Sequence, residues 1–232
     1  MKMKPKILDL FCGAGGCGKG YSDAGFEVFG VDIEAQPRYP FPFEQGDAIL
    51  TLRHLLDSGF VYPDGKPLRL EDFAAIHASP PCQGYSENMK HLSRPAKMLI
   101  EPCRRLLTKA GKPWIIENVE GAPLATETDL FGGNGVMLCG TQFGLRIWRH
   151  RLFETSFPID RPGPCRHDRP PLNPHREESR QRMRQEFGQV DLEKIWREEA
   201  GVAWMDKAGG RQAIPPAFTE FIGKQLIRTI SE

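Results

Sequence analysis

The sequence predicts an α/β fold with a doubly wound, mostly parallel sheet and a small irregular module. Two observations indicate this fold. Strand-like apolar runs alternate with segments of helical pattern, and each run ends in a polar or glycine-rich signature, as in parallel sheets that bind ligands at one edge. The 232 residues are 40% hydrophobic and 26% charged, which suits one soluble core with a small appendage. The four runs are Lys6–Phe11, Glu27–Val31, Phe73–Ala78 and Pro113–Ile116.

The first run leads into a glycine-rich stretch, Cys12 to Gly18, and then a helix over Lys19–Phe26. Glycines let the backbone approach a ligand closely, and a helix N-terminus offers unpaired N–H groups. The second run ends at Asp32, one βαβ unit downstream, where a carboxylate holds a ribose hydroxyl pair. This pattern indicates an adenosyl or dinucleotide cofactor. A tight structural turn is the alternative.

The chain between the second and third runs carries further signals. Gln36–Phe43 is rich in proline and aromatic residues and predicts a loop over the cofactor edge. Asp47 is another carboxylate at the end of a predicted strand, and a helix is expected around Ile49–Leu56. Ser58–Lys66 is a turn-rich insertion.

The third run delivers a cysteine, Cys82, behind two prolines. Pro80 and Pro81 fix two φ angles, so the chain leaves the strand stiffly and presents the thiol at the strand's carboxyl end. That position favours a reactive thiol over a buried structural one. The polar stretch Gln83–Arg94 is interpreted as a mobile loop that closes on substrate, with a plain surface loop as the alternative.

An amphipathic helix over Pro95–Lys109 precedes the fourth run, which ends at Glu117. Phe143–Phe153 continues the core and carries Arg149 and Arg151, which share one face if the chain is extended.

From Pro158 the chain is rich in proline and arginine, which predicts irregular structure ending in a helix near Gln181–Arg197. Between Arg146 and Arg184 there are ten arginines, no lysine and five acidic residues, a net charge of 10 − 5 = +5, so the rest of the chain nets −4. Guanidinium groups suit phosphates and base edges, although a solvated basic surface is the alternative. A proline-started helix over 217–230 must fold back on the sheet.

Six cysteines occur without C-x-x-C pairs, at positions 12, 17, 82, 103, 139 and 165. A chain of this size does not need disulfides, so we expect a reducing cytoplasm. Cys165, His167 and His175 suggest zinc, but no fourth ligand follows at a common spacing, so we expect no metal site. No apolar run approaches the length of a membrane span, so no membrane partner is expected.

Four motifs, in this order, resemble those of the DNA (cytosine-5) methyltransferases: Asp9-Leu10-Phe11-Cys12-Gly13-Ala14-Gly15-Gly16, Pro81-Cys82-Gln83, Glu117-Asn118-Val119 and Arg149-x-Arg151. The resemblance spans residues 7–153, and Gln212–Gly223 resembles the family's last motif. Two positions depart from the pattern: Ile147 stands where the family usually has glutamine, and Gln212 where it usually has asparagine. The region after Pro158 is shorter than in typical members, which implies a short recognition sequence and a compact phage-like or bacterial enzyme.

The resemblance implies a Rossmann-like methyltransferase fold and a mechanism. Cys82 would add to carbon 6 of cytosine, and Glu117 would hydrogen-bond ring nitrogen 3 and the exocyclic amine. Arg149 would support Glu117 and the cytosine carbonyl, while Arg151 orders the site. The base would be flipped out of the duplex. S-adenosylmethionine would be held by Phe11, Gly13, Gly15, Asp32, Ile33, Asp47 and Ser79, and DNA by Gln83, Ser86, Arg161, Arg166, Arg169 and Arg176.

We therefore expect a catalytic and cofactor-binding domain over residues 1–157, a target-recognition module over 158–200, and a segment over 201–232 that returns to the catalytic domain. The expected enzyme is a monomer that acts on double-stranded DNA in a bacterial or phage-infected cytoplasm. Alternatives stay open: the same chemistry on tRNA, transfer of a different one-carbon or modified group, and a catalytically silent DNA-binding module. A silent module needs neither Cys82 nor Glu117, and a nicotinamide dehydrogenase leaves the thiol unexplained.

Overall fold

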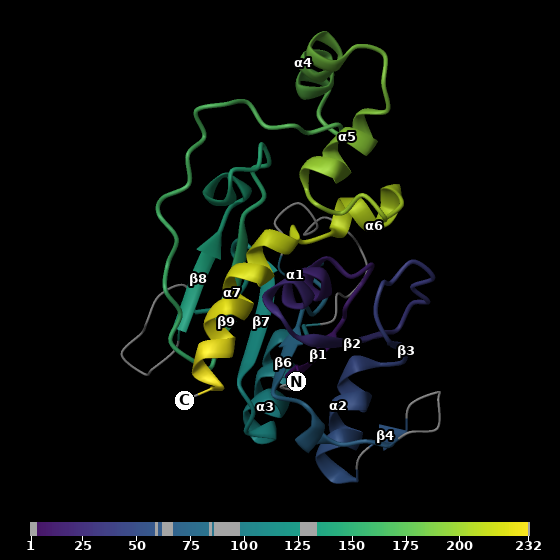
Figure 1. Cartoon of the computed structure of the whole chain (residues 1–232), viewed down its shortest axis with the longest axis vertical. Helices are drawn as coiled ribbons and strands as arrows, with labels where there is room; N and C mark the ends of the chain where they lie inside the picture. Colours follow the sequence, from purple (N-terminus) through teal and green to yellow (C-terminus); the bar gives the residue numbers. More distant parts are fainter. Residues whose placement is uncertain are drawn as a thin grey trace.

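A mixed seven-stranded sheet forms the centre of the protein, in the order β3-β2-β1-β6-β7-β9-β8 (Figure 1). This computed structural model describes residues 4–58, 60–61, 67–83, 85, 98–125 and 134–231. The strands are β1 (Lys6–Leu10), β2 (Glu27–Asp32), β3 (Phe43–Gln45), β6 (Ala75–Ala78), β7 (Trp114–Val119), β8 (Asn134–Leu138) and β9 (Arg151–Thr155). A separate antiparallel pair joins β4 (Phe60–Val61) to β5 (Pro67–Leu68).

The sheet is parallel from β3 to β7, and this confirms the predicted doubly wound α/β fold. Leu10 pairs with Val31 on one side and Ala78 on the other, so the carboxyl ends of β1, β2 and β6 lie together. The far edge differs from the expected arrangement, because β9 runs antiparallel to both β7 and β8. The predicted run Phe143–Phe153 becomes strand only at Arg151, and the short turn η3 (Gly140–Phe143) precedes it.

Helices α1 (Gly16–Ala24) and α7 (Pro216–Thr229) cover one face of the sheet (Figure 1). Their backbones are in close contact: a Cβ on Gly20 would lie 2.1 Å from the Pro216 carbonyl oxygen, so only glycine fits there. The Thr219 hydroxyl donates to the Cys17 carbonyl at 2.8 Å. The C-terminal helix therefore folds back on the sheet as predicted, and it fixes the helix that follows the glycine loop.

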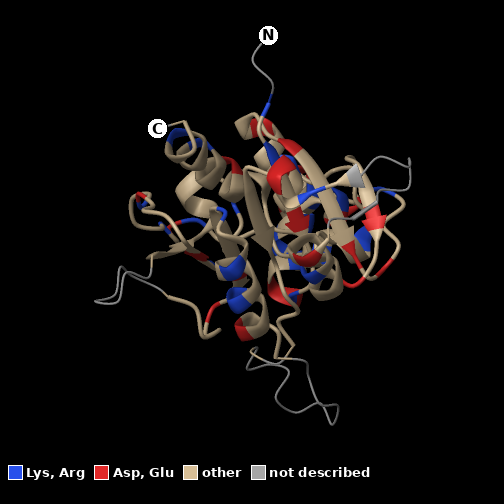
Figure 2. Cartoon of the chain, turned by 90° about the horizontal axis from the view of Figure 1, so that it is seen from below, with Lys and Arg blue, Asp and Glu red and all other residues tan. Residues whose placement is uncertain are grey.

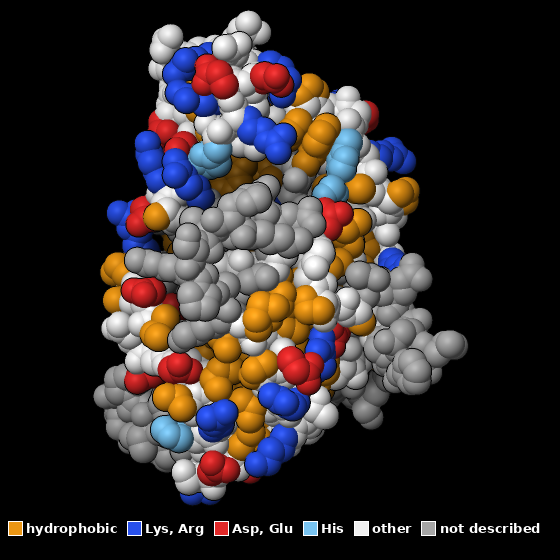
Figure 3. Space-filling model, turned by 180° about the vertical axis from the view of Figure 1, so that it is seen from behind, with side chains coloured by type: hydrophobic (Ala, Val, Ile, Leu, Met, Phe, Trp, Pro, Cys, Tyr) orange, Lys and Arg blue, Asp and Glu red, His pale blue; other side chains and the backbone are white. Residues whose placement is uncertain are grey.

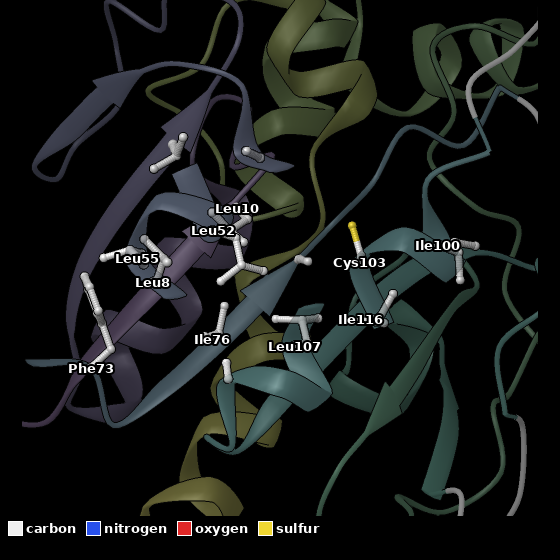
Figure 4. Close-up of a cluster of buried hydrophobic side chains, with 14 of the residues drawn as sticks. Leu8, Leu10, Leu52, Leu55, Phe73, Ile76, Ile100, Cys103, Leu107 and Ile116 are labelled. Atoms are coloured by element: carbon white, nitrogen blue, oxygen red, sulfur yellow. The ribbon is translucent and has the colours of Figure 1, made fainter. Parts of the chain in front are cut away.

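The other face is covered by α2 (Ala48–Asp57) and α3 (Ile100–Ala110), with the turn η1 (Leu70–Asp72) nearby. Figure 4 shows Leu52 and Leu107 from these helices directed toward Leu8, Ile76 and Ile116 of the strands. All five side chains are buried. Burial of each such side chain stabilises the folded protein by roughly 1.5–3 kcal/mol. Burial on both faces explains why these strands are continuous apolar runs in the sequence.

Three helices form a small module at one end of the molecule (Figure 1): α4 (Glu177–Phe187), α5 (Leu192–Glu199) and α6 (Lys207–Gln212). The single helix expected near Gln181–Arg197 is wrong. Gly188, with φ 77°, ends α4, and the Asp191 side chain accepts from the backbone N–H groups of Glu193 and Lys194 to start α5.

The module has its own hydrophobic cluster, which includes Met183, Trp196 and Met205. Ile147, the residue that departs from the family pattern, is 3% exposed in this cluster. Its apolar side chain therefore serves the packing of the module.

The chain between β9 and α4 has no helix or strand, as the prolines predict. Seen from below, acidic and basic residues are interspersed over helices and loops (Figure 2). The back view shows Lys and Arg side chains, among acidic ones, over the end where α4 and α5 lie (Figure 3). In the part of the chain that the structure describes, no helix combines the length and apolar character needed to cross a membrane.

Candidate active site

The polar signatures of four parallel strands meet at one edge of the sheet. The glycine loop follows β1, Asp32 ends β2, the Cys82 loop follows β6, and Glu117 lies in β7. These strands are adjacent in the order β2-β1-β6-β7, so residues far apart in the sequence come together there. Ligands bind at this edge in open α/β sheets.

The Cys82 loop is held by three backbone contacts. The Ser79 N–H donates to the Leu10 carbonyl at 3.1 Å, and the Tyr85 N–H donates to the Cys82 carbonyl at 2.9 Å. Asn118, 1% exposed, donates from Nδ2 to the Pro80 carbonyl at 2.8 Å. Cys82 itself is a half-buried free thiol. The sequence did not assign Asn118 a role, although its place beside Glu117 at a strand end was a signal.

Glu117 is a buried carboxyl group, 6% exposed. Its Oε1 lies 3.0 Å from Nε of Arg151. Burial raises the pKa of Glu117, while the charge of Arg151, a hydrogen bond from Ser79 and the charge of Arg149 oppose that rise. Glu117 is thus a carboxyl whose protonated form is stabilised and which can donate a hydrogen bond to a ligand.

The two arginines have different positions from those expected. Arg151 contacts Glu117, whereas Arg149 lies before the strand and donates from Nη2 to the Arg211 carbonyl at 3.0 Å. Burial lowers the pKa of Arg149 to about 9; the Arg151 charge adds to this, and the charges of Glu117 and Cys82 oppose it. Its Nε is buried and has no hydrogen-bond partner among the described residues.

A buried hydrogen-bond chain leads to Glu117 from the α1 side. The Tyr21 hydroxyl lies 2.9 Å from Nδ1 of His77, and Nε2 of His77 lies 2.8 Å from the Ser79 hydroxyl. His77 is fully buried, and burial lowers its pKa to about 3, so its ring is neutral.

The bond from Ser79 to Glu117 sets the direction of this chain. A neutral imidazole has one donor and one acceptor nitrogen. If Tyr21 donates to Nδ1, then Nε2–H donates to Ser79, and the Ser79 proton can be donated to Glu117. His77 was not predicted as a site residue, although a histidine inside an apolar strand must find hydrogen-bond partners when it is buried.

Asp32, Ile33 and Asp47 lie along the predicted cofactor edge. Asp32 accepts from the Gly13 N–H at Oδ2 and from the Glu34 N–H at Oδ1, both at 2.9 Å. Ile33 is 59% exposed, an apolar surface suited to a flat ring. Asp47 caps α2 through Oδ1 alone, and its Oδ2 has no hydrogen-bond partner in the described part of the chain. Carboxylates for ribose and adenine, with an apolar side chain between them, fit an adenosyl group.

The glycine loop supports the same fit at two of its three predicted residues. Phe11 has φ 57°, an uncommon conformation that recurs at functional sites. A Cβ on Gly13 would meet nothing within 4 Å, so this glycine faces open space. Gly15 instead packs against Tyr39: a Cβ there would lie 3.0 Å from the ring.

Asp9 is a further buried acid under the glycine loop. Oδ2 accepts from the Tyr39 hydroxyl at 3.1 Å, and Oδ1 has no partner among the described residues. Burial raises the pKa of Asp9 to about 7, with Tyr39 opposing the rise and Asp32 adding to it. The residue belongs to a quoted motif, but the sequence alone did not single it out.

The predicted DNA-binding residues are more dispersed. Gln83 is exposed beside Cys82, and Ser86 lies outside the described residues. Arg161, Arg166, Arg169 and Arg176 are exposed, and Arg161 donates to the Gly135 carbonyl of β8 at 3.4 Å. The structure thus gathers the catalytic and cofactor candidates at one edge and spreads the arginines over the segment between β9 and α4.

Comparison with known proteins gives one family and several relatives. A family model described as C-5 cytosine-specific DNA methylase matches residues 5–131. The type II methyltransferase M.AgeI of Thalassovita gelatinovora is 27% identical over 174 residues, which are 64% of this chain and 38% of that protein. The chain therefore spans well under half the length of this curated relative.

Two solved structures align with this chain. The S. pombe Dnmt2 methyltransferase aligns over 99% of this chain and 100% of its own, with a TM-score of 0.54 and 11% identity. A putative DNA modification methyltransferase encoded within an E. coli prophage aligns over 66% of this chain and 46% of its own, with a TM-score of 0.44 and 20% identity. The first of these likenesses supports the fold.

Proposed function

Because the chain belongs to the C-5 cytosine-specific DNA methylase family, we propose that it methylates carbon 5 of cytosine in DNA through a covalent adduct with Cys82. S-adenosylmethionine is the methyl donor of this family. One observation carries the proposal: the Cys82 loop and the buried Glu117–Arg151 pair lie at the same sheet edge, next to the cofactor candidates. The predicted roles of the individual residues are part of this proposal.

The Cys82 thiol activates the cytosine ring for methylation. Carbon 5 of cytosine is a poor nucleophile, but addition of the Cys82 thiolate to carbon 6 turns the ring into an enamine-like nucleophile. The loop contacts from Ser79 and Asn118 hold the backbone around the thiol, so its approach to the base is set before the base arrives.

Glu117 stabilises the base as the adduct forms. A protonated Glu117 donates to ring nitrogen 3 and accepts from the exocyclic amine, which offsets the charge that the thiolate brings. Arg151 and Ser79 orient the carboxyl group. The Arg149 guanidinium is the donor for the cytosine carbonyl oxygen, as the resemblance implies, whereas the contact with Glu117 is made by Arg151.

Asp32, Ile33 and Asp47 would hold the adenosyl part of S-adenosylmethionine, with Phe11 and Gly13 beside it. Bound there, the sulfonium group supplies an electrophilic methyl group. Carbon 5 takes this methyl group and then gives up its proton to water, and the electrons of that C–H bond expel Cys82 from carbon 6 as a thiolate. The enzyme returns to its starting state.

The substrate is double-stranded DNA in this proposal. Carbon 5 and carbon 6 are not accessible within a stacked duplex, so the target base is flipped out. The exposed arginines of residues 158–200 hold phosphates and read a short sequence. Residues 1–157 and helix α7 form the catalytic domain, while α6 packs with the recognition module. We further propose that the protein is a monomer in a bacterial or phage-infected cytoplasm, where it acts in restriction-modification. The relative named as a type II methyltransferase supports this role.

Transfer of labelled methyl from S-adenosylmethionine tests the substrate. Unmethylated duplex DNA and unmodified tRNA are offered separately to the native protein and to Cys82→Ala, and the DNA product is sequenced after bisulfite treatment. We expect label on DNA at carbon 5 in one short sequence context, and none with the variant. Label on tRNA alone, or on neither, would overturn the proposal.

A fluorinated duplex tests the adduct separately. Fluorine at carbon 5 cannot leave as a proton does, so the methylated intermediate stays bonded to the enzyme. We expect a complex that survives denaturation with native protein and is absent with Cys82→Ser. Methylation of ordinary duplex without such a complex would argue for transfer without a covalent step.

A further inference from the structure

A cluster of two cysteines and two histidines lies at the end of β8 and the start of β9. Cys139, His150, Cys165 and His167 each direct one ligand atom toward the others, and these four atoms all lie within 4.8 Å of one another. Sγ of Cys139 is 3.4 Å from Nε2 of His167, and Sγ of Cys165 is 3.8 Å from Nε2 of His150.

The fold brings these residues together from three places. Leu138 of β8 pairs with Arg151 of β9, so Cys139 and His150 are the next residues beyond the end of that antiparallel pair. Cys165 and His167 come from the proline-rich segment, two residues apart and so on one side where the chain is extended. The sequence lacked a fourth ligand for Cys165 and His167 because the two partners lie elsewhere in the chain.

We propose that Cys139, His150, Cys165 and His167 form a tetrahedral structural zinc site. With Zn–S near 2.3 Å and Zn–N near 2.0–2.1 Å, tetrahedral geometry places sulfur and nitrogen ligands about 3.6 Å apart. The two sulfur–nitrogen distances lie on either side of that value. Two thiolates and two imidazoles form a complete, closed ligand set of the kind that holds structural zinc.

The surroundings supply outer partners. Nδ1 of His150 lies 3.7 Å from Oε2 of Glu120, so a carboxylate faces the ring nitrogen opposite the one that faces Cys165. The His167 ring stacks on Trp148 with centroids 4.3 Å apart. The Thr141 hydroxyl lies 3.3 Å from Sγ of Cys139. These contacts orient the ligands.

The segment around Cys165 is held mainly by hydrogen bonds rather than by buried side chains. None of residues 158–171 is buried, and half-buried Ile159, at the start of the segment, is the residue of this range that packs against a hydrophobic cluster. The segment is attached beside the cluster: Gln142 donates to the Gly163 carbonyl at 2.8 Å, and the Arg166 N–H donates to Thr141 at 3.1 Å. A zinc ion would fasten this segment to the ends of β8 and β9.

The site has a consequence for the proposed function. His150 lies between Arg149 and Arg151, and Arg166 lies between the two ligands of the segment. Zinc at His150 would fix the backbone that carries both catalytic candidates, and zinc at Cys165 and His167 would fix a candidate phosphate contact. This part rests on the proposed function, whereas zinc binding itself does not.

Metal analysis of the full chain, prepared without chelator and with added Zn²⁺, tests the site. We expect about one zinc ion per chain, lost in Cys165→Ser and His167→Asn. Cys82→Ser and His54→Gln remove one thiol and one exposed imidazole from outside the cluster, and should keep the metal. Replacement by Co²⁺ should give the visible bands of a tetrahedral site with thiolate ligands.

A proteolysis experiment on the native protein tests the site without relying on variants that could fail to fold. Trypsin does not cleave before proline, so Arg161 and Arg169 are protected by sequence, while the Arg166–His167 bond lies inside the cluster. We expect native protein to resist cleavage there until a chelator removes zinc, and to regain resistance with Zn²⁺ alone. Native protein that holds no zinc after Zn²⁺ addition, or that contains a Cys139–Cys165 disulfide in its place, would overturn the proposal. Neither readout involves methyl transfer.

Discussion

Nε of Arg151 lies 3.0 Å from Oε1 of Glu117, across two adjacent antiparallel strands. A second pair bridges α3 and the same sheet: Nε of Arg104 lies 2.7 Å from Oε1 of Glu154. Both glutamates are buried, but only the first pair lies at the edge that carries Cys82. We therefore expect the Arg151–Glu117 pair to serve catalysis and the Arg104–Glu154 pair to serve stability.

Arg151→Met is expected to lower methyl transfer by about 10²-fold, because Glu117 loses the group that orients it. Arg104→Met is the matched control. It leaves Glu154 buried without its cation and should lower the free energy of unfolding by roughly 3 kcal/mol, while transfer per folded molecule stays near the native rate. Steady-state kinetics and urea unfolding of both variants check this. Equal loss of transfer in both would assign Arg151 a purely structural role.

Ser79→Ala is expected to extend activity to higher pH. Burial raises the pKa of Glu117, and the hydrogen bond from Ser79 opposes that rise, so removing the hydroxyl lets the pKa rise further. If transfer needs protonated Glu117, the alkaline limb of kcat/KM moves upward. Tyr21→Phe should raise the alkaline limb by a smaller amount. It removes the hydrogen bond to Nδ1 of His77, so the proton on the His77 ring is no longer held on Nε2, but the Ser79 hydroxyl stays in place. An alkaline limb that stays fixed in Ser79→Ala would contradict this role.

Asp32→Asn is expected to weaken binding of S-adenosylmethionine by about 10- to 100-fold, the range for a lost hydrogen bond to a charged group. Asp32 also holds the glycine loop through the Gly13 N–H, so the loss affects both the contact and the loop. Titration calorimetry measures the affinity. Asp23→Asn, on the exposed surface of α1, removes only an ion pair with Lys19 and should bind as the native protein does. Unchanged affinity in Asp32→Asn would place the ribose elsewhere.

His77 is expected to make the fold less stable in acid. Its pKa is about 3 in the folded protein and 6.5 in the unfolded chain, so the unfolded chain takes the proton first. Stability is therefore lost as pH falls from 6.5 toward 3, by about 2 kcal/mol between pH 7 and pH 5. His77→Gln should not lose this stability. The difference in the free energy of unfolding between native protein and variant, measured by urea unfolding, should therefore be about 2 kcal/mol smaller at pH 5 than at pH 7.

The control for this comparison is His54→Gln, which removes an exposed histidine and should leave the pH dependence of stability unchanged.

Buried Asp9 changes the stability in the opposite direction. Its pKa is raised to about 7 in the folded protein, so its ionisation above pH 3.8 favours the unfolded chain. That contribution is present in native and variant proteins alike and cancels in their difference. A constant difference between native and His77→Gln proteins at both pH values would contradict a neutral buried His77.

The parallel strands, the order of the signatures and the family could all be predicted from the amino-acid sequence. Apolar runs such as Glu27–Val31 and the prolines before Cys82 act within a few residues, and chain order alone brings parallel strand ends to one edge. The family and the mostly parallel fold are confirmed. The antiparallel β8 and the break at Gly188 were not predicted, because short strands and single turns give weak local patterns.

The contacts between distant side chains could be seen only in the folded protein. Arg151 rather than Arg149 contacts Glu117 because strand pairing starts at Arg151. Tyr21 and His77 are 56 residues apart in the sequence but face each other across α1 and β6. Cys139 meets His167 because the chain after β9 returns to the end of β8. Such contacts depend on packing between distant segments, so the spacing of residues along the chain does not predict them.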